Sequence, residues 1–231
     1  MPACNEADSL GPTLESLRAA AASAGELGLF LVDDGSDVPI ELDALPAPTA
    51  HFHVTLARHV VNLGQGAALE TARQLALGSA AGFDAYVTMD ADGQHVASDA
   101  IELGRAIAAG ADVAFGNRFE GDSNVPAARR VLLLGAGWFE RALTGLRLAD
   151  AHNGLRAFSR RAIEQISIHQ NRMAHATEIK QRVADAGSLA VVEVPVTVRY
   201  SRRTLRRGQS GLGAVVILAD LILQYLFREE S

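Results

Sequence analysis

The chain has 231 residues, of which 48% are hydrophobic and 21% charged, with 21 Gly and 7 Pro. This composition is typical of one globular domain and excludes a collagen-like, coiled-coil or disordered chain. The formal charge of −6 argues against a dedicated nucleic-acid-binding protein. Cys4 is the only cysteine, which excludes an internal disulfide and any multi-cysteine zinc site, and suits a reducing compartment.

Apolar runs alternate with helical patterns along the chain, which is typical of an α/β domain. In the first half we expect helices over 9–24 and 67–80, buried strands over 29–32 and 53–56, and a loop over 37–50. The chain opens on the loop-like segment 2–6 rather than on an apolar run. We therefore expect the first strand of the sheet to be missing or truncated.

In the second half we expect strands over 85–89, 112–116, 155–158 and 190–200, with Pro195 interrupting the last, and helices over 100–109, 129–144 and 174–186. Ligands of open α/β sheets bind beyond the carboxyl ends of the strands. The acidic and glycine-rich loops that follow these strands should therefore converge on one site.

Asp90 and Asp92 follow the strand predicted over 85–89. Two carboxylates on such a turn can hold one hard cation, since Mg²⁺ and Mn²⁺ prefer oxygen ligands and keep positions for substrate phosphates. A metal held there would neutralise a departing diphosphate. Surface turns also carry this pattern without a metal, but the place after a strand and the continuation Gly93-Gln94-His95 favour a metal site.

Two further motifs lie at predicted element ends. Asp33-Asp34-Gly35-Ser36 can accept hydrogen bonds from a base or ribose, or form a turn with a helix cap. Asn62-Leu63-Gly64-Gln65-Gly66 opens the helix over 67–80 and can turn its backbone amides toward an anion, although such turns are common without a ligand.

Taken in this order, the motifs resemble family 2 glycosyltransferases of the GT-A fold, above all the dolichol-phosphate mannosyltransferase and polyprenyl-phosphate glycosyltransferase group. The resemblance begins at Pro2-Ala3-Cys4-Asn5-Glu6 and continues after His95 through Gly116-Asn117-Arg118, Asp150-x-x-Asn153-Gly154-Leu155-Arg156, Glu178 and Glu193-Val194-Pro195-Val196. It implies a GT-A domain over 1–210, with a mostly parallel central sheet flanked by helices, followed by an apolar helix over 211–231.

The resemblance also implies roles for individual residues. The nucleotide pocket would be lined by Pro2, Ala3, Glu6, Asp34, Gly64 and Asp90, and the metal, Mg²⁺ or Mn²⁺, would be bound by Asp90, Asp92 and Gln94. The acceptor phosphate would be held by Arg118, by Arg129 or Arg130, and by Arg207 and Ser210 of the late basic motif. In that motif Gln209 stands where the family has lysine, so one positive charge is missing.

The implied reaction is an inverting transfer of a sugar from a nucleoside diphosphate to a polyprenyl or dolichyl phosphate, with Asp92, Arg118, Arg130 and Asp150 as its catalytic set. A phosphate acceptor is already ionised at neutral pH and needs no general base. A hydroxyl acceptor needs one, and Asp150 or Asp122 would then serve. The alternatives are a soluble family 2 enzyme with a hydroxyl acceptor, and a non-catalytic homologue that binds nucleotide or membrane.

The end of the chain bears on the acceptor. Five arginines precede an apolar stretch over 212–227: Arg199, Arg202, Arg203, Arg206 and Arg207. Such a segment can lie on an anionic membrane surface, or pack on the sheet or on a second copy of the chain. No signal-peptide pattern and no spanning-length apolar run is visible. We expect a cytoplasmic protein with peripheral membrane contact through 199–227, and a homo-oligomer is an open alternative.

Overall fold

The computed structural model describes residues 1–125, 127–150, 153–171 and 174–200. Residues 1–199 form one unit, and Tyr200 begins a second unit that otherwise lies outside the described residues. The helix expected over 211–231 falls in that second unit, as do Arg207, Gln209 and Ser210. None of the helices in the described ranges is long and apolar enough to cross a membrane.

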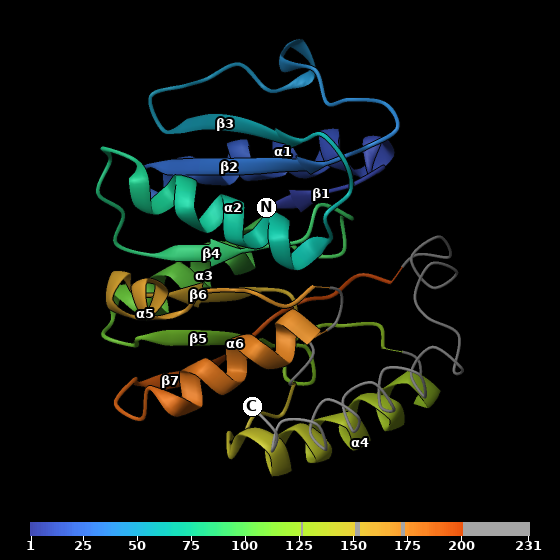
Figure 1. Cartoon of the computed structure of the whole chain (residues 1–231), viewed down its shortest axis with the longest axis vertical. Coiled ribbons are helices and arrows are strands. Elements are labelled where there is room, and N and C mark those ends of the chain that lie inside the picture. The colour runs from blue at the N-terminus through green and yellow to red at the C-terminus, as the bar shows by residue number, and fades with distance from the viewer. Residues whose placement is uncertain (126, 151–152, 172–173, 201–231) are drawn as a thin grey trace. The chain divides into compact units, whose positions relative to one another are not determined.

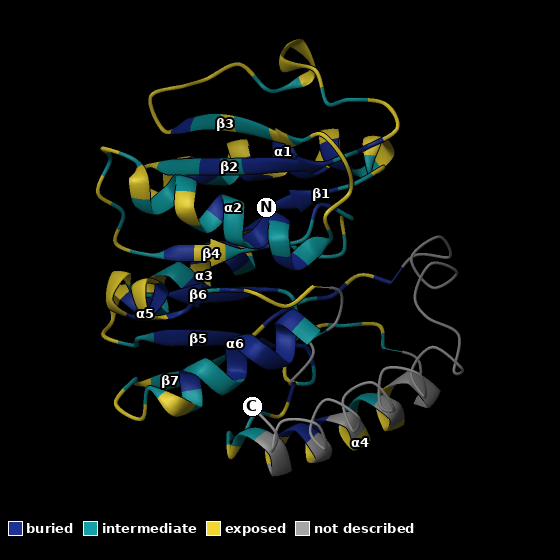
Figure 2. Ribbon diagram, in the orientation of Figure 1, coloured by how far each residue is buried: buried dark blue, intermediate teal, exposed yellow. Residues whose placement is uncertain are grey.

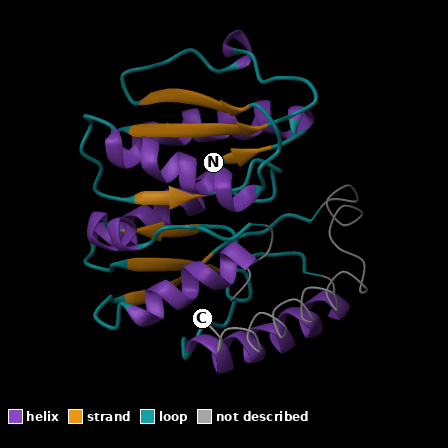
Figure 3. Cartoon of the chain, viewed as in Figure 1, coloured by secondary structure: helices purple, strands orange, loops and turns teal. Residues whose placement is uncertain are grey.

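The strands of the first unit form two sheets (Figures 1 and 3). The first sheet is parallel, with the order β1-β2-β3, and consists of β1 (Pro2–Ala3), β2 (Leu27–Asp34) and β3 (Phe52–His59). The second has the order β4-β6-β5-β7 and consists of β4 (Tyr86–Thr88), β6 (Arg156–Phe158), β5 (Val113–Asn117) and β7 (Val191–Pro195). In the second sheet β6 runs antiparallel to β4 and β5, whereas β5 and β7 are parallel. The expected α/β fold with parallel strands is confirmed, but the strands do not form one sheet.

Helices cover both faces of the strands. In Figure 1, α2 (Gln65–Gly78) and α6 (Ala174–Asp185) lie in front of the strands, and α1 (Ala7–Ala24) and α3 (Ala97–Ala108) lie behind them. The remaining helices are α4 (Ala127–Thr144), the six-residue α5 (Arg160–Gln165) and the short 3-10 helix Leu42–Ala44. Strands with helices on both faces must be apolar on both faces, which explains the uninterrupted hydrophobic run over 29–32 in β2.

Two elements differ from the sequence expectation. Segment 2–6 contains the short strand β1, which pairs with β2 at Val32 and Asp33. The helix α5 follows β6 directly, and Ser159 caps it by accepting a hydrogen bond from the backbone N–H of Ala162 at 3.2 Å. A six-residue helix is too short to show a helical period, so only the cap could have signalled it.

A large apolar cluster lies between the second sheet and helices α2, α5 and α6. Its members include the fully buried side chains of Phe115, Phe158, Ile166 and Ile179. Figure 2 shows the buried interior along the strands. Each such side chain contributes roughly 1.5–3 kcal/mol to the free energy of unfolding. This core fixes β4 and β5, whose carboxyl ends carry Asp90 and Arg118 to the same edge of the strands (right in Figure 1).

Candidate active site

The carboxylate of Asp34, at the end of β2, holds the loop that opens α2. Its two oxygens accept hydrogen bonds from the backbone N–H groups of Leu63 (2.9 Å) and Gly64 (2.8 Å). Its Oδ1 also lies 2.7 Å from Nδ1 of His59, whose Nε2 lies 2.9 Å from Oγ1 of Thr71. Asp34 is buried. In this structure its oxygens serve protein donors, and the contact predicted with a base or ribose stays a prediction.

Asp33 shapes the turn that follows β2. This fully buried carboxylate accepts hydrogen bonds from the backbone N–H groups of Ser36 (3.0 Å) and Ile40 (3.1 Å). Burial raises the pKa of Asp33, but these hydrogen bonds and the charge of Arg58 outweigh it and hold the pKa below its usual value. Gly35 has a φ of 68°, and a Cβ there would lie 2.4 Å from the backbone before α2, so the turn requires glycine.

The amino-terminal motif lies beside this turn. Pro2 and Ala3 are buried in β1, and Glu6 occupies the N-cap position of α1. Between them, the backbone N–H of Asn5 donates to Oγ of Ser36 at 3.0 Å. Asn5 and Ser36 are 31 residues apart in the sequence, so this hydrogen bond joins the first two sequence motifs.

The start of α2 is packed against a loop from a distant part of the chain. A Cβ on Gly66 would lie 1.9 Å from the carbonyl oxygen of Gln170. The backbone N–H of Ala67 donates to Oδ1 of Asn171 at 2.9 Å, and Glu178 holds the same loop by accepting from the backbone N–H of Gln170 at 2.8 Å. These glycine and amide groups serve contacts within the protein, and the predicted anion contact has no direct geometric support here.

Asp90 follows β4, and its side chain is 31% exposed. Its Oδ1 accepts a hydrogen bond from Nε2 of Gln65 at 2.8 Å, and its Oδ2 lies 3.9 Å from Nε2 of His95. Burial raises the pKa of this carboxyl, but its interactions with His95, Arg156 and His175 outweigh burial and hold the pKa below its usual value. The site therefore favours an ionised carboxylate.

Asp92 lies two residues further and is engaged by Gln94. Its Oδ1 accepts from the backbone N–H of Gln94 at 3.0 Å, and Nε2 of Gln94 donates to its Oδ2. The described residues contain no ready cluster of three His, Cys, Asp or Glu side chains for a metal. The carboxylates of Asp90 and Asp92 nevertheless have the oxygen chemistry that Mg²⁺ and Mn²⁺ prefer, with phosphate oxygens as further ligands. Gln94 presents its amide nitrogen, not its oxygen, to Asp92.

The chain entering β6 also reaches this site. A Cβ on Gly154 would lie 2.3 Å from Oδ2 of Asp90. Arg156, opposite Thr88 in the ladder, is buried, and its Nε has no acceptor among the described residues. Burial lowers the pKa of Arg156, and the carboxylates of Asp90 and Asp150 oppose that shift. Sequence reasoning gave Arg156 no role, and its only signal was its place in the motif that follows Asp150.

Arg118 and Asp150 form a buried ion pair. Nε of Arg118 donates to Oδ2 of Asp150 at 2.5 Å, and the backbone N–H of Arg118 donates to the same oxygen at 3.0 Å. Nδ2 of Asn153 donates to it as well, at 3.1 Å. Glu193 fixes the backbone of Asp150 by accepting its N–H at 3.2 Å. Asp150 is therefore a buried ion-pair partner of Arg118. A general base would instead face solvent.

The second predicted acceptor arginine is Arg129 or Arg130, both in α4, and the side chain that the structure describes is that of Arg130. Its Cζ lies 5.5 Å from the ring centroid of Phe119, the residue that follows Arg118. The side chain of Arg129 lies outside the described residues. Asp122, the other candidate base, is exposed in the loop after β5.

The predicted groups are connected through the loop before α2 and through β6. Gly64 donates to Asp34, and the next residue, Gln65, donates to Asp90. On the other side, Arg156 interacts electrostatically with both Asp90 and Asp150. Residues predicted for nucleotide, metal and acceptor are thus linked by short chains of contacts.

The family is decided by comparison with known sequences. The family model "Glycosyl transferase family 2" matches residues 1–167. The chain belongs to glycosyltransferase family 2.

Two curated relatives of this family 2 glycosyltransferase match most of its length. The uncharacterized protein MJ1222 of Methanocaldococcus jannaschii is 30% identical over 98% of this chain and 91% of its own. The undecaprenyl-phosphate mannosyltransferase of Micrococcus luteus is 31% identical over 85% of this chain and 81% of its own. Among solved structures, Mycobacterium tuberculosis glucosyl-3-phosphoglycerate synthase with Mn²⁺ and UDP-glucose gives a TM-score of 0.61 at 16% identity, over 97% of this chain and 75% of that one. This likeness shows a shared GT-A-like fold.

Proposed function

We propose that this glycosyltransferase moves a sugar from a nucleoside diphosphate to a polyprenyl phosphate, with inversion at the anomeric carbon. The observation that carries the proposal is the buried ion pair between Arg118 and Asp150. In this pair Asp150, one of the two candidate bases, is bound to Arg118. A phosphate acceptor needs no base, because it is already ionised at neutral pH. The undecaprenyl-phosphate mannosyltransferase among the relatives supports the same acceptor class.

The donor would lie along the edge from Asp34 to Asp90. Asp90 and Asp92 would hold a divalent cation, which when bound supplies positive charge for the departing diphosphate. The solved neighbour that holds Mn²⁺ together with UDP-glucose supports this requirement. His95 and Gln65 orient the Asp90 carboxylate, and the low pKa of Asp90 keeps it ionised for that role.

The acceptor phosphate would be held by arginines. Arg118 is fixed by Asp150, and Arg130 stands over the neighbouring Phe119 ring. A guanidinium group that is already oriented loses little conformational freedom when it binds a phosphate. Arg207 and Ser210 stay part of the proposal from the sequence. So does peripheral contact of 199–227 with the membrane, since a polyprenyl chain is itself held in the bilayer.

The decisive experiment compares two acceptors that differ only in the phosphate. The purified chain is incubated with Mn²⁺ and labelled UDP- or GDP-sugars, and with either undecaprenyl phosphate or undecaprenol in detergent micelles. We expect a lipid-linked product with the phosphate alone, and none after EDTA. The matched variant Asp122→Asn should keep full transfer. Equal glycosylation of undecaprenol, or loss of transfer in Asp122→Asn, would instead support a hydroxyl acceptor.

A further inference from the structure

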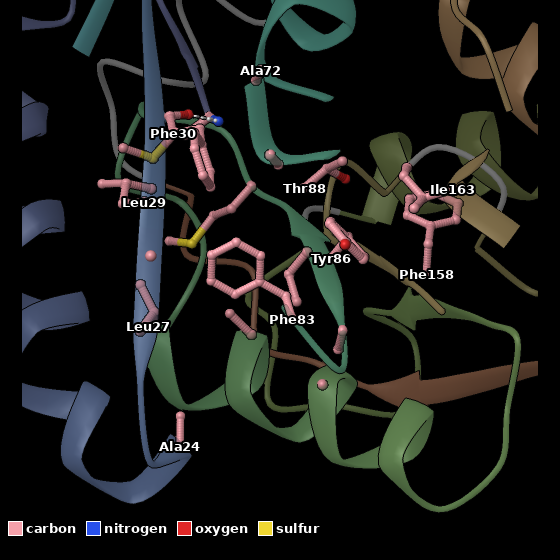
Figure 4. Close-up of a pocket in the computed structure, with 18 of the residues that line it drawn as sticks. Ala24, Leu27, Leu29, Phe30, Ala72, Phe83, Tyr86, Thr88, Phe158 and Ile163 are labelled. Carbon is pink, nitrogen blue, oxygen red and sulfur yellow. Dashed lines mark hydrogen bonds between the residues drawn. The ribbon is translucent and has the colours of Figure 1, made fainter. Parts of the chain in front are cut away.

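The loop that follows β4 carries Asp92, which the proposed function assigns, together with Asp90, to a divalent cation. β4 has three residues, pairs with β6 and lines an apolar cavity of about 330 Å³ between β2 and β4 (Figure 4). Its ladder with β6 ends at Thr88, so strand pairing does not reach loop 92–95. The position of this loop therefore depends on contacts with other parts of the chain.

Segment 196–199, which continues from β7, makes such contacts. The backbone N–H of Arg199 donates to the carbonyl oxygen of Gln94 at 2.9 Å, and the segment also forms an isolated antiparallel bridge with loop 92–95. Gln94 in turn donates its own backbone N–H to Oδ1 of Asp92 at 3.0 Å. Two hydrogen bonds in series thus connect segment 196–199 to a carboxylate proposed to bind the metal.

Ser123, in the loop after β5, holds segment 196–199 in this path. Its Oγ accepts the backbone N–H of Val198 at 2.7 Å and donates to the carbonyl oxygen of Val196 at 3.2 Å. One hydroxyl group therefore serves as acceptor and donor for two positions of the same segment, which a side chain without a hydroxyl cannot do. Val196 and Val198 are both buried, so the hydroxyl fixes a backbone that is packed into the protein.

The chain that follows β5 packs closely on the same segment. A Cβ on Gly121 would overlap the carbonyl oxygen of Val196, so this approach requires glycine. Val196 donates its backbone N–H to the carbonyl oxygen of Asn117 at 3.1 Å. Asn117 is followed directly by Arg118, which is proposed to hold the acceptor phosphate. Segment 196–199 thus contacts both the loop proposed for the metal and the chain that carries an acceptor arginine.

The fourth backbone N–H of the segment has a partner of its own. Thr197 donates it to Oδ2 of Asp99, in the first turn of α3, at 2.6 Å. Four consecutive N–H groups are therefore bound by four parts of the chain: the end of β5, α3, the loop after β5 and the loop after β4. A strand at the edge of a sheet directs its N–H groups to a single neighbour. Segment 196–199 is instead a junction between these elements.

We propose that Ser123 is a positioning residue for sugar transfer, which acts through segment 196–199 on the loop that carries Asp92. Without the hydroxyl, the segment loses two hydrogen bonds, and the Gln94 carbonyl loses a fixed donor. The carboxylate of Asp92 is then no longer held in place for the cation. The consequence for transfer rests on the proposed function, whereas the contacts that carry the inference hold for any donor or acceptor.

The test compares the full chain with the variants Ser123→Ala, Ser123→Thr and Ser159→Ala. Threonine keeps the hydroxyl and should behave as the native chain does. The hydroxyl of Ser159 also accepts a backbone N–H, at the start of α5. Because β6 is antiparallel to β4, Ser159 lies at the end of the strands opposite Asp90. Ser159→Ala therefore removes a structural hydroxyl that has no path to the metal loop, and it serves as the matched control.

Hydrogen exchange is measured first, without metal or nucleotide. In Ser123→Ala the amides of Gln94 and Arg199 should exchange at least ~10-fold faster than in the native chain, and in the other two variants they should not change. In the native chain the amides of Gln94, Val198 and Arg199 should open together, with protection equal within ~3-fold. The native comparison decides the matter if Ser123→Ala does not fold, because independent opening of these amides would overturn the proposal.

The second measurement is the Mn²⁺ dependence of transfer, and of the rise in melting temperature caused by UDP or GDP. Ser123→Ala should need at least ~10-fold more Mn²⁺ for the half-maximal effect, with kcat at saturating Mn²⁺ within ~2-fold of native. Unchanged exchange at Gln94 and Arg199 in folded Ser123→Ala, or the same Mn²⁺ dependence in Ser123→Ala and Ser159→Ala, would overturn the proposal. Exchange needs no ligand, so it still tests the role of Ser123 if the native chain transfers no sugar.

Discussion

Nε of Arg118 lies 2.5 Å from Oδ2 of Asp150, and both side chains are buried. A buried ion pair of this kind holds each partner in one orientation, and removal of either partner takes a buried counter-charge from the other. The pair therefore makes Asp150 a positioning residue for Arg118 at the edge where the acceptor is proposed to bind.

Asp150→Asn should lower the free energy of unfolding by about 3 kcal/mol, because the guanidinium of Arg118 then loses its buried counter-charge. Transfer to a polyprenyl phosphate should fall with it, mainly through a higher KM for the acceptor. Urea denaturation and acceptor titrations measure the two effects. A variant of native stability with only kcat reduced would instead make Asp150 a catalytic base.

Gly154→Ala should reduce transfer at least ~100-fold while the protein stays folded. The new methyl group would lie 2.3 Å from Oδ2 of Asp90 and must displace that carboxylate, and misplacement by an ångström is enough for such a loss. The matched control is Gly11→Ala in α1, where a Cβ meets nothing within 4 Å. Transfer rates of the two variants with Mn²⁺ check this, and equal rates would contradict it.

Asp34→Ala should cost about 2 kcal/mol of stability, because the partly buried N–H groups of Leu63 and Gly64 lose their acceptor. Since the same loop carries Gln65 toward Asp90, the rise in melting temperature caused by nucleotide with Mn²⁺ should also shrink. The exposed neighbour Asp37 provides the control variant, Asp37→Ala. A full nucleotide-induced shift in Asp34→Ala would show that the loop does not support donor binding.

Stability should depend on the ionisation of the Met1 amino group. Its pKa is about 5 in the folded protein against a usual value of 8, so the unfolded chain binds more protons between these values. The stability is complete above pH 8 and falls as the pH is lowered toward 5, by up to about 4 kcal/mol. Acetylation of the amino group should remove this contribution. Urea denaturation of both forms at pH 5.5 and 8 measures it, and a difference that does not change with pH would refute it.

The only lysine, Lys180 in α6, forms a buried ion pair with Glu140 of α4. Glu140 also accepts a hydrogen bond from Oγ1 of Thr177 at 2.9 Å. Lys180→Met should destabilise the fold by about 3–5 kcal/mol, since it removes a buried counter-charge of the Glu140 carboxylate. The double variant with Glu140→Leu should recover most of the loss. Additive losses in urea denaturation would show that the two charges are not coupled.

Local sequence pattern predicted much of the fold. Long periodic or uninterrupted apolar runs placed α1, α2, β2 and β5 within a few residues of their bounds. It missed β1 and α5, which are too short to show a period. The division into two sheets was also beyond it, because strand order depends on contacts between distant segments.

The sequence indicated which residues belong to the candidate site, but it did not indicate which of them contact one another. Asp90 and Arg118 follow strand ends, and their place could be inferred from that alone. Asp34 accepts hydrogen bonds from backbone groups 29 and 30 residues away, and Asp150 pairs with Arg118. These contacts depend on how the chain folds and cannot be read from local sequence. Arg156 carried no signal of its own, since its burial follows from β6 lying between two other strands.

The apolar cavity of about 330 Å³ between β2 and β4 has a thermodynamic consequence for the donor. The groups proposed to contact a sugar nucleotide lie on both of its sides, Asp34 after β2 and Asp90 after β4. A ligand that contacts both sides favours one placement of the two strands, and by reciprocity whatever favours that placement tightens the binding of the ligand by the same factor. The relative placement of these two strands and the affinity for the donor then behave as one linked equilibrium.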